Sequence, residues 1–234
     1  MEIIAPASLQ ISYRWDQRLN HGRGGYRSAA SGRVVAWNTV RESLDRTIAN
    51  AEANTRSLCA DLREGRISLA EWQLRMRDET RSAHVASYVL QRGGWQQMSQ
   101  ADYGRVGREL RDQYKYLNRF AQEIKSGKQR LDGTLQNRAL LYIRPGRHTF
   151  HKAETKTALL LGFDQERYVL HPADHCRSHR KHMGCVERAA ASWQPIGLLP
   201  DIGECTCHSN DRCTKVFRDS RTRRVFDPSK RVNQ

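Results

Sequence analysis

The sequence predicts a mainly α-helical protein, in which an N-terminal helical bundle is followed by a small, irregular, zinc-knot-like metal-binding lobe with little β structure. Two observations lead to this prediction. Apolar residues recur every three to four positions through much of residues 33–145, which is the spacing of one helix face. Five of the six cysteines then fall within residues 176–213, where histidine, glycine and proline are frequent.

The first segment, residues 1–32, is expected to be a flexible N-terminal arm. Residues 21–28 read His-Gly-Arg-Gly-Gly-Tyr-Arg-Ser, and a segment rich in glycine and arginine has little tendency to form regular structure.

A long amphipathic helix is expected over residues 33–64. Thr39 and Glu42 match the Thr-x-x-Glu pair that begins many helices, and Gly65 is a suitable stop. Cys59 lies beside the apolar stripe, so it is expected to pack as a small hydrophobic residue. The stripe itself consists of Val40, Leu44, Ile48, Ala51, Leu58 and Leu62.

Two further helices have clear start and stop residues. Ser68 and Glu71 begin one of them, and Gly93 ends it. Ser99 and Asp102 begin the next, whose apolar face is the most regular in the chain. That face consists of Tyr103, Val106, Leu110, Tyr114, Leu117, Ala121 and Ile124.

A shorter helix is expected over residues 134–143, because Pro145 cannot continue it. Single helices are marginal in water, so the apolar stripes must be buried against one another. Short glycine-containing connections between the helices therefore imply a bundle over residues 33–145. Its expected core or interface anchors are Trp37, Trp72 and Trp95.

Residues 146–217 are expected to form the Cys/His-rich domain. Residues 156–162 have helical character and residues 167–170 are β-prone, but the remainder is poor in apolar residues. Such a segment needs a source of stability other than a hydrophobic core. Residues 218–234 are expected to be a basic tail.

The net charge of +15 favours a polyanionic partner, since neutralising phosphates releases counterions. On the third helix, Asp112 and Glu123 interrupt the basic face, so both a solvated surface and a nucleic-acid track remain open. The candidate contacts to nucleic acid or to a partner are Arg108, Arg111, Lys115 and Arg119 on that face, with Arg218, Arg221, Arg223 and Arg224 in the tail.

The clustered cysteines indicate a structural zinc site. Zinc prefers four thiolate or imidazole ligands in a tetrahedron, and two chain segments commonly supply two ligands each. The first-choice ligands are Cys176, Cys185, Cys207 and Cys213, and the alternates are His179, His182, Cys205, His208 and Asp211. The competing interpretation is a set of buried thiols with one or two disulfides.

An enzyme is not expected. The chain contains no phosphate-binding P-loop, no dinucleotide-binding glycine pattern, no nucleophile elbow and no zinc-deaminase motif. Asp174 and His175 beside a zinc site are similar to the start of an HNH-type nuclease motif, which leaves a metal-dependent nuclease as a secondary alternative.

The C-terminal segment contains a recognisable series of residues: His175, Cys176, Cys185, Trp193, Pro195, Gly197, Pro200, Cys207 and Cys213. This series resembles the end of tailed-bacteriophage minor head proteins of the Mu-type head-morphogenesis group. The resemblance covers residues 168–217. Compared with the family pattern, the first cysteine pair is widened by a His-rich insertion, Asp211 replaces a cysteine and Ser192 replaces a glycine. His179, His182 or Asp211 could therefore serve as ligands.

This resemblance implies a structural minor component of the virion, near the portal or the inner capsid, present in several copies. Its helices would contact other virion proteins, capsid or portal, and its basic surface would face packaged DNA without reading sequence. The sequence shows no signal peptide or membrane span, so assembly is expected in the host cytoplasm without a membrane partner. The alternative is a cytoplasmic zinc-containing nucleic-acid-binding protein.

Overall fold

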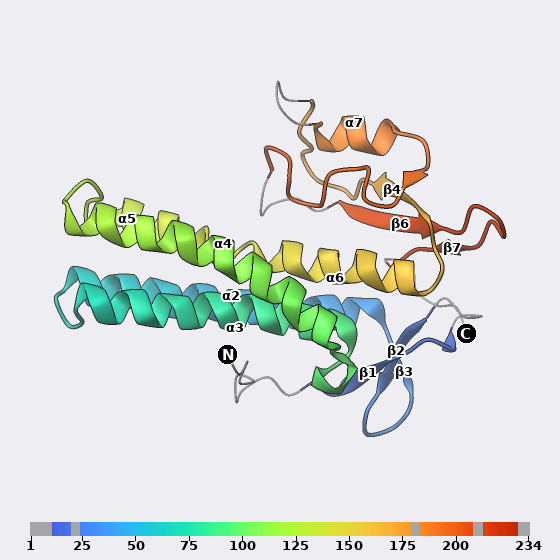
Figure 1. Cartoon of the computed structure of the whole chain (residues 1–234), viewed down its shortest axis with the longest axis horizontal. Helices are drawn as coiled ribbons and strands as arrows, with labels where there is room; N and C mark the ends of the chain where they lie inside the picture. The colour runs from blue at the N-terminus through green and yellow to red at the C-terminus, as the bar shows by residue number, and fades with distance from the viewer. Residues whose placement is uncertain (1–10, 20–23, 179–182, 208–212, 229–234) are drawn as a thin grey trace.

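The computed structural model describes residues 11–19, 24–178, 183–207 and 213–228, and this part of the chain is mainly helical with two small sheets. In Figure 1 the long helices lie side by side as a bundle, and α3 packs against α2, α4 and α6. No helix in the described ranges has a stretch long and apolar enough to cross a membrane. The helices are α2 (Trp37–Arg63), α3 (Leu69–Arg92), α4 (Gln100–Lys125), α5 (Gly133–Leu140), α6 (Gly146–Leu160) and α7 (Cys185–Ala190), with a 3-10 turn η1 (Trp95–Gln97).

Most of the expected helix ends are present. The side chain of Ser68 accepts a hydrogen bond from the backbone of Glu71, and Ser99 forms a reciprocal capping box with Asp102. Gly93 ends α3 in the left-handed conformation, with φ of 79°. The expected start of α2 is wrong, because the helix begins at Trp37 and not at residue 33. Its N-cap is Ala36, which makes no side-chain hydrogen bond, so Thr39 lies inside the helix and does not cap it.

The predicted apolar stripes form the core of the bundle. All six expected stripe residues of α2 are buried, and Trp72 of α3 is fully buried. Cys59 packs in the same core, and burial raises the pKa of its thiol to about 11, which keeps it an inert packing residue. Trp37 is a partly buried neighbour of one core cluster and Trp95 of another.

The expectation of a flexible arm over residues 1–32 is wrong for its described part. Strands β1 (Tyr13–Asp16), β2 (Gly25–Ser28) and β3 (Val34–Val35) form an antiparallel sheet in that order. Tyr13 and Tyr26 are buried, and the Tyr26 hydroxyl donates to the backbone carbonyl of Gln91 at the end of α3. Two aromatic anchors thus fold an otherwise polar segment onto the bundle.

The expected domain boundary at residue 145 is also misplaced. Helix α6 continues to Leu160 and packs along α3, so the bundle includes this helix. The helix expected over residues 156–162 is only the C-terminal part of α6. Inside the contact, the ring nitrogen Nδ1 of His84 lies 2.7 Å from the hydroxyl of Thr149, and both side chains are buried.

The C-terminal lobe contains more sheet than expected. Its strands β4 (Gln165–Val169), β5 (Gln194–Pro195), β6 (Thr214–Arg218) and β7 (Val225–Phe226) pair antiparallel in the order β5-β4-β6-β7. The β-prone run expected at residues 167–170 lies mostly in β4. The prediction of a tail from residue 218 is wrong as far as residue 228, because β7 is part of this sheet.

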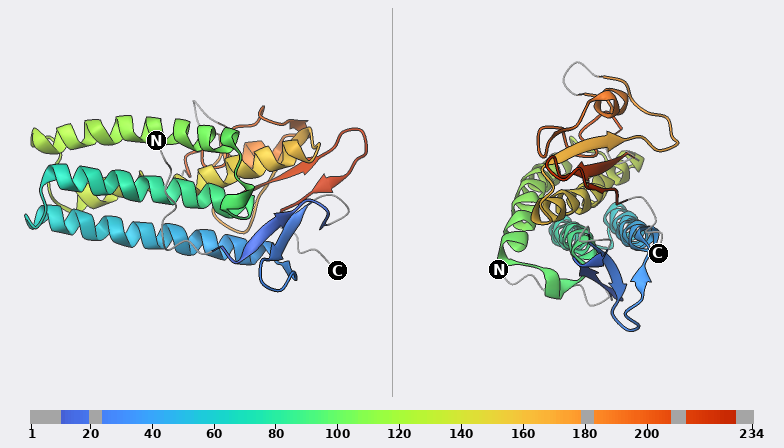
Figure 2. Two further views of the ribbon diagram at one scale, coloured as in Figure 1. Left: turned by 60° about the horizontal axis from the view of Figure 1, so that its bottom comes forward. Right: turned by 90° about the vertical axis from the view of Figure 1, so that its right-hand side faces the viewer.

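Aromatic residues join the lobe to the bundle. Phe226 of β7 stacks on Phe163 and Phe217 with ring centroids 5.8 Å and 6.0 Å apart, and meets Trp15 of β1 edge-on. Ala158 of α6 closes this cluster. Figure 1 and the right-hand view of Figure 2 show the lobe beside α6, on the side facing away from α2 and α3.

Candidate metal centre

The first pair of sulfurs comes from a close approach between two backbone segments. Cys185 is the first residue of α7, and its N–H donates to the sulfur of Cys176 at 3.3 Å. The next N–H, that of Val186, donates to the backbone carbonyl of Cys176. Gly184 makes this possible, since a Cβ at that position would overlap with the backbone of Arg177. The local sequence therefore brings Cys176 and Cys185 together despite the eight residues between them.

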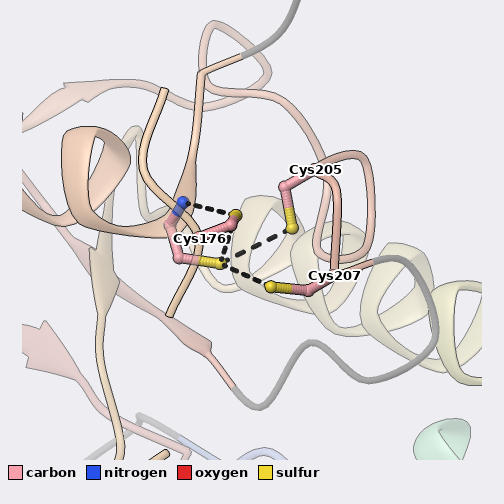
Figure 3. A group of neighbouring side chains, drawn as sticks. Cys176, Cys205 and Cys207 are labelled. Carbon is pink, nitrogen blue, oxygen red and sulfur yellow. Dashed lines mark hydrogen bonds between the residues drawn. The ribbon is translucent and has the colours of Figure 1, made fainter. Parts of the chain in front are cut away.

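The second pair, Cys205 and Cys207, lies on the loop that precedes β6. The Sγ of Cys185 is 3.5 Å from that of Cys205, 3.8 Å from that of Cys207 and 3.6 Å from that of Cys176. All four sulfurs lie within 4.8 Å of one another. Figure 3 shows the side chains of Cys176, Cys205 and Cys207 converging on one point from three directions.

These distances fit a tetrahedral zinc site. With Zn–S bonds of about 2.3 Å, the sulfurs of a tetrahedron lie about 3.8 Å apart. A disulfide would require an S–S distance of about 2.05 Å, far shorter than any of the three distances from Cys185. The residues present therefore fit a thiophilic divalent cation, and we call Cys176, Cys185, Cys205 and Cys207 the four-sulfur group.

The surroundings of Cys176 favour its thiolate form. Burial alone would raise the pKa of this thiol. Hydrogen bonds from Thr206, from the backbone N–H of Cys185 and from the thiols of Cys207 and Cys185 outweigh burial and lower the pKa to about 6. The thiolate is the form that ligates metals, so this sulfur is prepared for binding at neutral pH.

A buried arginine ties the two ligand segments together. Arg188 of α7 is fully buried, three residues after Cys185. Its guanidinium donates to the backbone carbonyls of Asp201 and Glu204, at 3.0 Å and 2.6 Å, and to the hydroxyl of Tyr168 at 3.0 Å. The loop that carries Cys205 is thus attached to the helix that carries Cys185.

A buried ion pair organises the loop between β5 and Cys205. Lys215 of β6 and Glu166 of β4 are 2% exposed or less, and their charged atoms lie 2.9 Å apart. The other oxygen of Glu166 accepts from the backbone N–H groups of Gly197 and Leu199. Buried polar contacts therefore hold this lobe together alongside its hydrophobic cluster, and sequence periodicity could not reveal them.

The predicted ligand set differs from the four-sulfur group at one position. Cys205, expected only as an alternate, takes the place assigned to Cys213. Cys213 is instead grouped with His175 and Cys185, whose ligand atoms lie within 4.8 Å of one another. The spacing of the cysteines does not distinguish Cys205 from Cys213, because either could pair with Cys207. His179, His182, His208 and Asp211 lie outside the described residues.

The predicted basic contacts fall into two kinds. The side chains on α4 are exposed, and none has a carboxylate within 4.0 Å among the described residues; they are Arg108, Arg111, Lys115 and Arg119. Of the four arginines expected in the tail, Arg221 and Arg223 are exposed. Arg218 stacks over the ring of Trp193, and Arg224 lies over Phe163 and pairs with Asp219. These two arginines pack within the lobe.

Comparison of the chain with known protein families, with curated proteins and with solved structures finds no match.

Proposed function

We propose that this chain is a non-enzymatic assembly protein of a tailed-phage head, and that one structural zinc ion on the four-sulfur group shapes its C-terminal lobe. The observation that carries the proposal is the convergence of Cys176, Cys185, Cys205 and Cys207 at the sulfur spacing of a zinc tetrahedron.

The donor set supports a structural role for the ion. A catalytic zinc keeps one position for water or substrate, whereas four cysteine thiolates fill the tetrahedron. Cys185 and Cys205 are buried, and polar tethers surround them. The ion would add stability to a lobe whose hydrophobic cluster is small, as metals do in other small modules.

The virion role is supported by the residue pattern of residues 168–217 and by how that segment folds. Pro195 lies in β5, and Gly197 adopts φ of 91° where its N–H reaches Glu166. The residues that carry the resemblance therefore belong to one folded unit around the cysteines. The exposed faces of the helices would provide contacts to capsid or portal proteins, with the chain in several copies per virion.

Detection of the protein in purified phage particles tests this role. Mass spectrometry of particles and of DNA-free heads should find the chain in both, together with portal and capsid proteins. Its absence from heads and particles that contain the other structural proteins would contradict the virion role and leave the zinc site unaffected.

A nucleic-acid-binding protein is the second candidate, favoured by the four exposed basic side chains along α4. If this role holds, the isolated protein binds duplex DNA with an affinity that falls steeply with salt. Replacing Arg108 and Arg111 by glutamine should then weaken binding and reduce the salt dependence, while Arg63 and Arg75, which have acidic partners, serve as matched control positions. Tight association with portal or capsid and negligible DNA binding would favour the first candidate.

A further inference from the structure

A second group of ligand atoms adjoins the four-sulfur group. The Nδ1 of His175 lies 3.8 Å from the Sγ of Cys213, and both atoms lie within 4.8 Å of the Sγ of Cys185. For a zinc ion bound to sulfur at about 2.3 Å and to nitrogen at about 2.05 Å, the expected separation of the two ligand atoms is about 3.6 Å. Cys185 belongs to both groups, so it stands between two possible ion positions.

The hydrogen bonding of His175 prepares it as a ligand. Its Nε2 contacts the backbone carbonyl of His171, which can only accept a hydrogen bond. Nε2 must therefore carry the proton, and in the neutral ring the lone pair resides on Nδ1, the atom that faces the sulfurs. A histidine that donates its other N–H to a carbonyl is the usual arrangement at metal sites.

We propose that the lobe binds a second thiophilic divalent cation of the zinc class, held by His175, Cys185 and Cys213, with the thiolate of Cys185 bridging the two ions. This inference rests on the proposed function for the first ion. A thiolate sulfur has more than one lone pair and can bond to two metals. A water molecule commonly completes the tetrahedron at a zinc ion with three protein ligands.

Charge balance supports two ions over one. With one divalent cation on the four-sulfur group, Cys213 stays a neutral thiol and two negative charges remain, whereas five thiolates on two cations leave one. Cys185, Cys205 and Cys213 are each 2% exposed or less, and uncompensated charge is costly in such surroundings. The second cation also gives a role to Cys213, which the four-sulfur group does not use.

Zinc content of the full-length chain tests the proposal. Protein purified in zinc and freed of loosely bound metal should contain two zinc ions per chain. The variants Cys213→Ser and His175→Ala should each retain one zinc ion. The control variant Cys59→Ala, which changes a cysteine in the helical bundle, should retain two zinc ions. Cys185→Ser should lose the second ion and bind the first more weakly than the wild type does, because it removes a ligand from both sites.

A measurement on the unmodified chain avoids any folding defect of the variants. Cadmium NMR of the cadmium-loaded protein should show two resonances with scalar coupling between them, which requires a bridging sulfur. The second site would be overturned, and the first left intact, by the following result: the wild-type chain binds one zinc ion, Cys213→Ser retains it and Cys205→Ser loses it. No bound zinc in the wild-type chain would overturn the proposed function itself.

Discussion

The guanidinium of Arg188 donates a hydrogen bond to the backbone carbonyl of Glu204, and the two atoms are 2.6 Å apart. Arg188 is on the helix that begins with Cys185, and Glu204 directly precedes Cys205. One buried side chain therefore sets the separation of the two segments that supply the ligands. We expect the folding of the lobe to depend on this contact as well as on the proposed ion.

Replacing Arg188 by methionine should destabilise the lobe and weaken metal binding. Methionine keeps much of the volume but removes every donor, so the carbonyls of Asp201 and Glu204 and the Tyr168 hydroxyl each lose a hydrogen bond. Unsatisfied buried groups cost about 1–3 kcal/mol each. Competition with a chromophoric chelator should show zinc affinity at least tenfold lower. The matched control Arg221→Met, at an exposed position, should bind zinc as the wild type does; equal affinities in both variants would contradict the role of Arg188.

A Cβ at Gly203 should disturb the docking of the ligand loop on α6. Gly203 has φ of 87°, and a Cβ there would overlap with the imidazole of His148. Gly197 has a similar φ of 91° but nothing within 4 Å of the added atom, so Gly197→Ala measures the backbone strain alone. That strain costs about 1 kcal/mol, and thermal unfolding should show a larger loss for Gly203→Ala.

The double variant Gly203→Ala, His148→Ala separates the overlap from other effects of the substitution. Removing the ring relieves the overlap, so the alanine at position 203 should cost about as much in this background as the alanine at position 197 does in the wild type. If Gly203→Ala still destabilises the His148→Ala background more than Gly197→Ala destabilises the wild type, the imidazole ring is not the cause of the additional loss.

His84 should make the stability of the bundle depend on pH. The pKa of this imidazole is lowered from 6.5 to about 4. Burial is the main cause, His148 and Lys152 act in the same direction, and a hydrogen bond to the backbone of Tyr142 opposes the shift. Between pH 6.5 and 4 the unfolded chain binds a proton at His84 that the folded chain does not. The free energy of unfolding should therefore decrease as the pH is lowered from 6.5 to 4, and His84 should account for up to about 3 kcal/mol of this decrease.

Urea unfolding of the wild type and of His84→Asn at several pH values isolates this contribution. Asparagine can retain the contact with Thr149 but does not titrate. The difference in unfolding free energy between the two proteins should narrow as the pH falls from 6.5 to 4. A difference independent of pH would show that His84 does not cause the dependence.

Phe226 should matter for the attachment of the lobe, because its ring joins Phe163, Phe217 and Trp15. Phe226→Ala should cost about 3–5 kcal/mol, the usual cost of removing a buried phenylalanine. Limited proteolysis should then cut the lobe faster than the bundle. Leu198→Ala, at a site 66% exposed, is the control and should behave as the wild type. If residues 218–228 were only a tail, Phe226→Ala would change neither the stability nor the rate of proteolysis of the lobe.

Helical parts of the fold could be predicted well because their determinants are local. Ser68, Ser99 and Gly93 act on neighbouring backbone groups, and the apolar stripe of α2 follows from helix geometry. The N-terminal sheet could not be predicted in the same way. Its short strands are polar, and only the burial of Tyr13 and Tyr26 against distant parts of the chain holds them in place.

The metal centre could be predicted only in outline. Clustering of cysteines indicates a metal site, but the positions of Cys205 in the four-sulfur group and of Cys213 beside His175 depend on contacts between segments far apart in the sequence. The pairing of Glu166 with Lys215 joins residues on two strands and leaves no pattern in the sequence. Contacts between distant residues decide these details.

Hydrogen exchange of the protein with and without a strong zinc chelator tests the central claim most directly. Amides of α7 and of residues 205–207 should be protected with metal bound and should exchange rapidly after its removal, while α2, α3 and α4 stay protected. Protection of the lobe that persists in metal-free protein would contradict the claim that a zinc ion on the four-sulfur group shapes it.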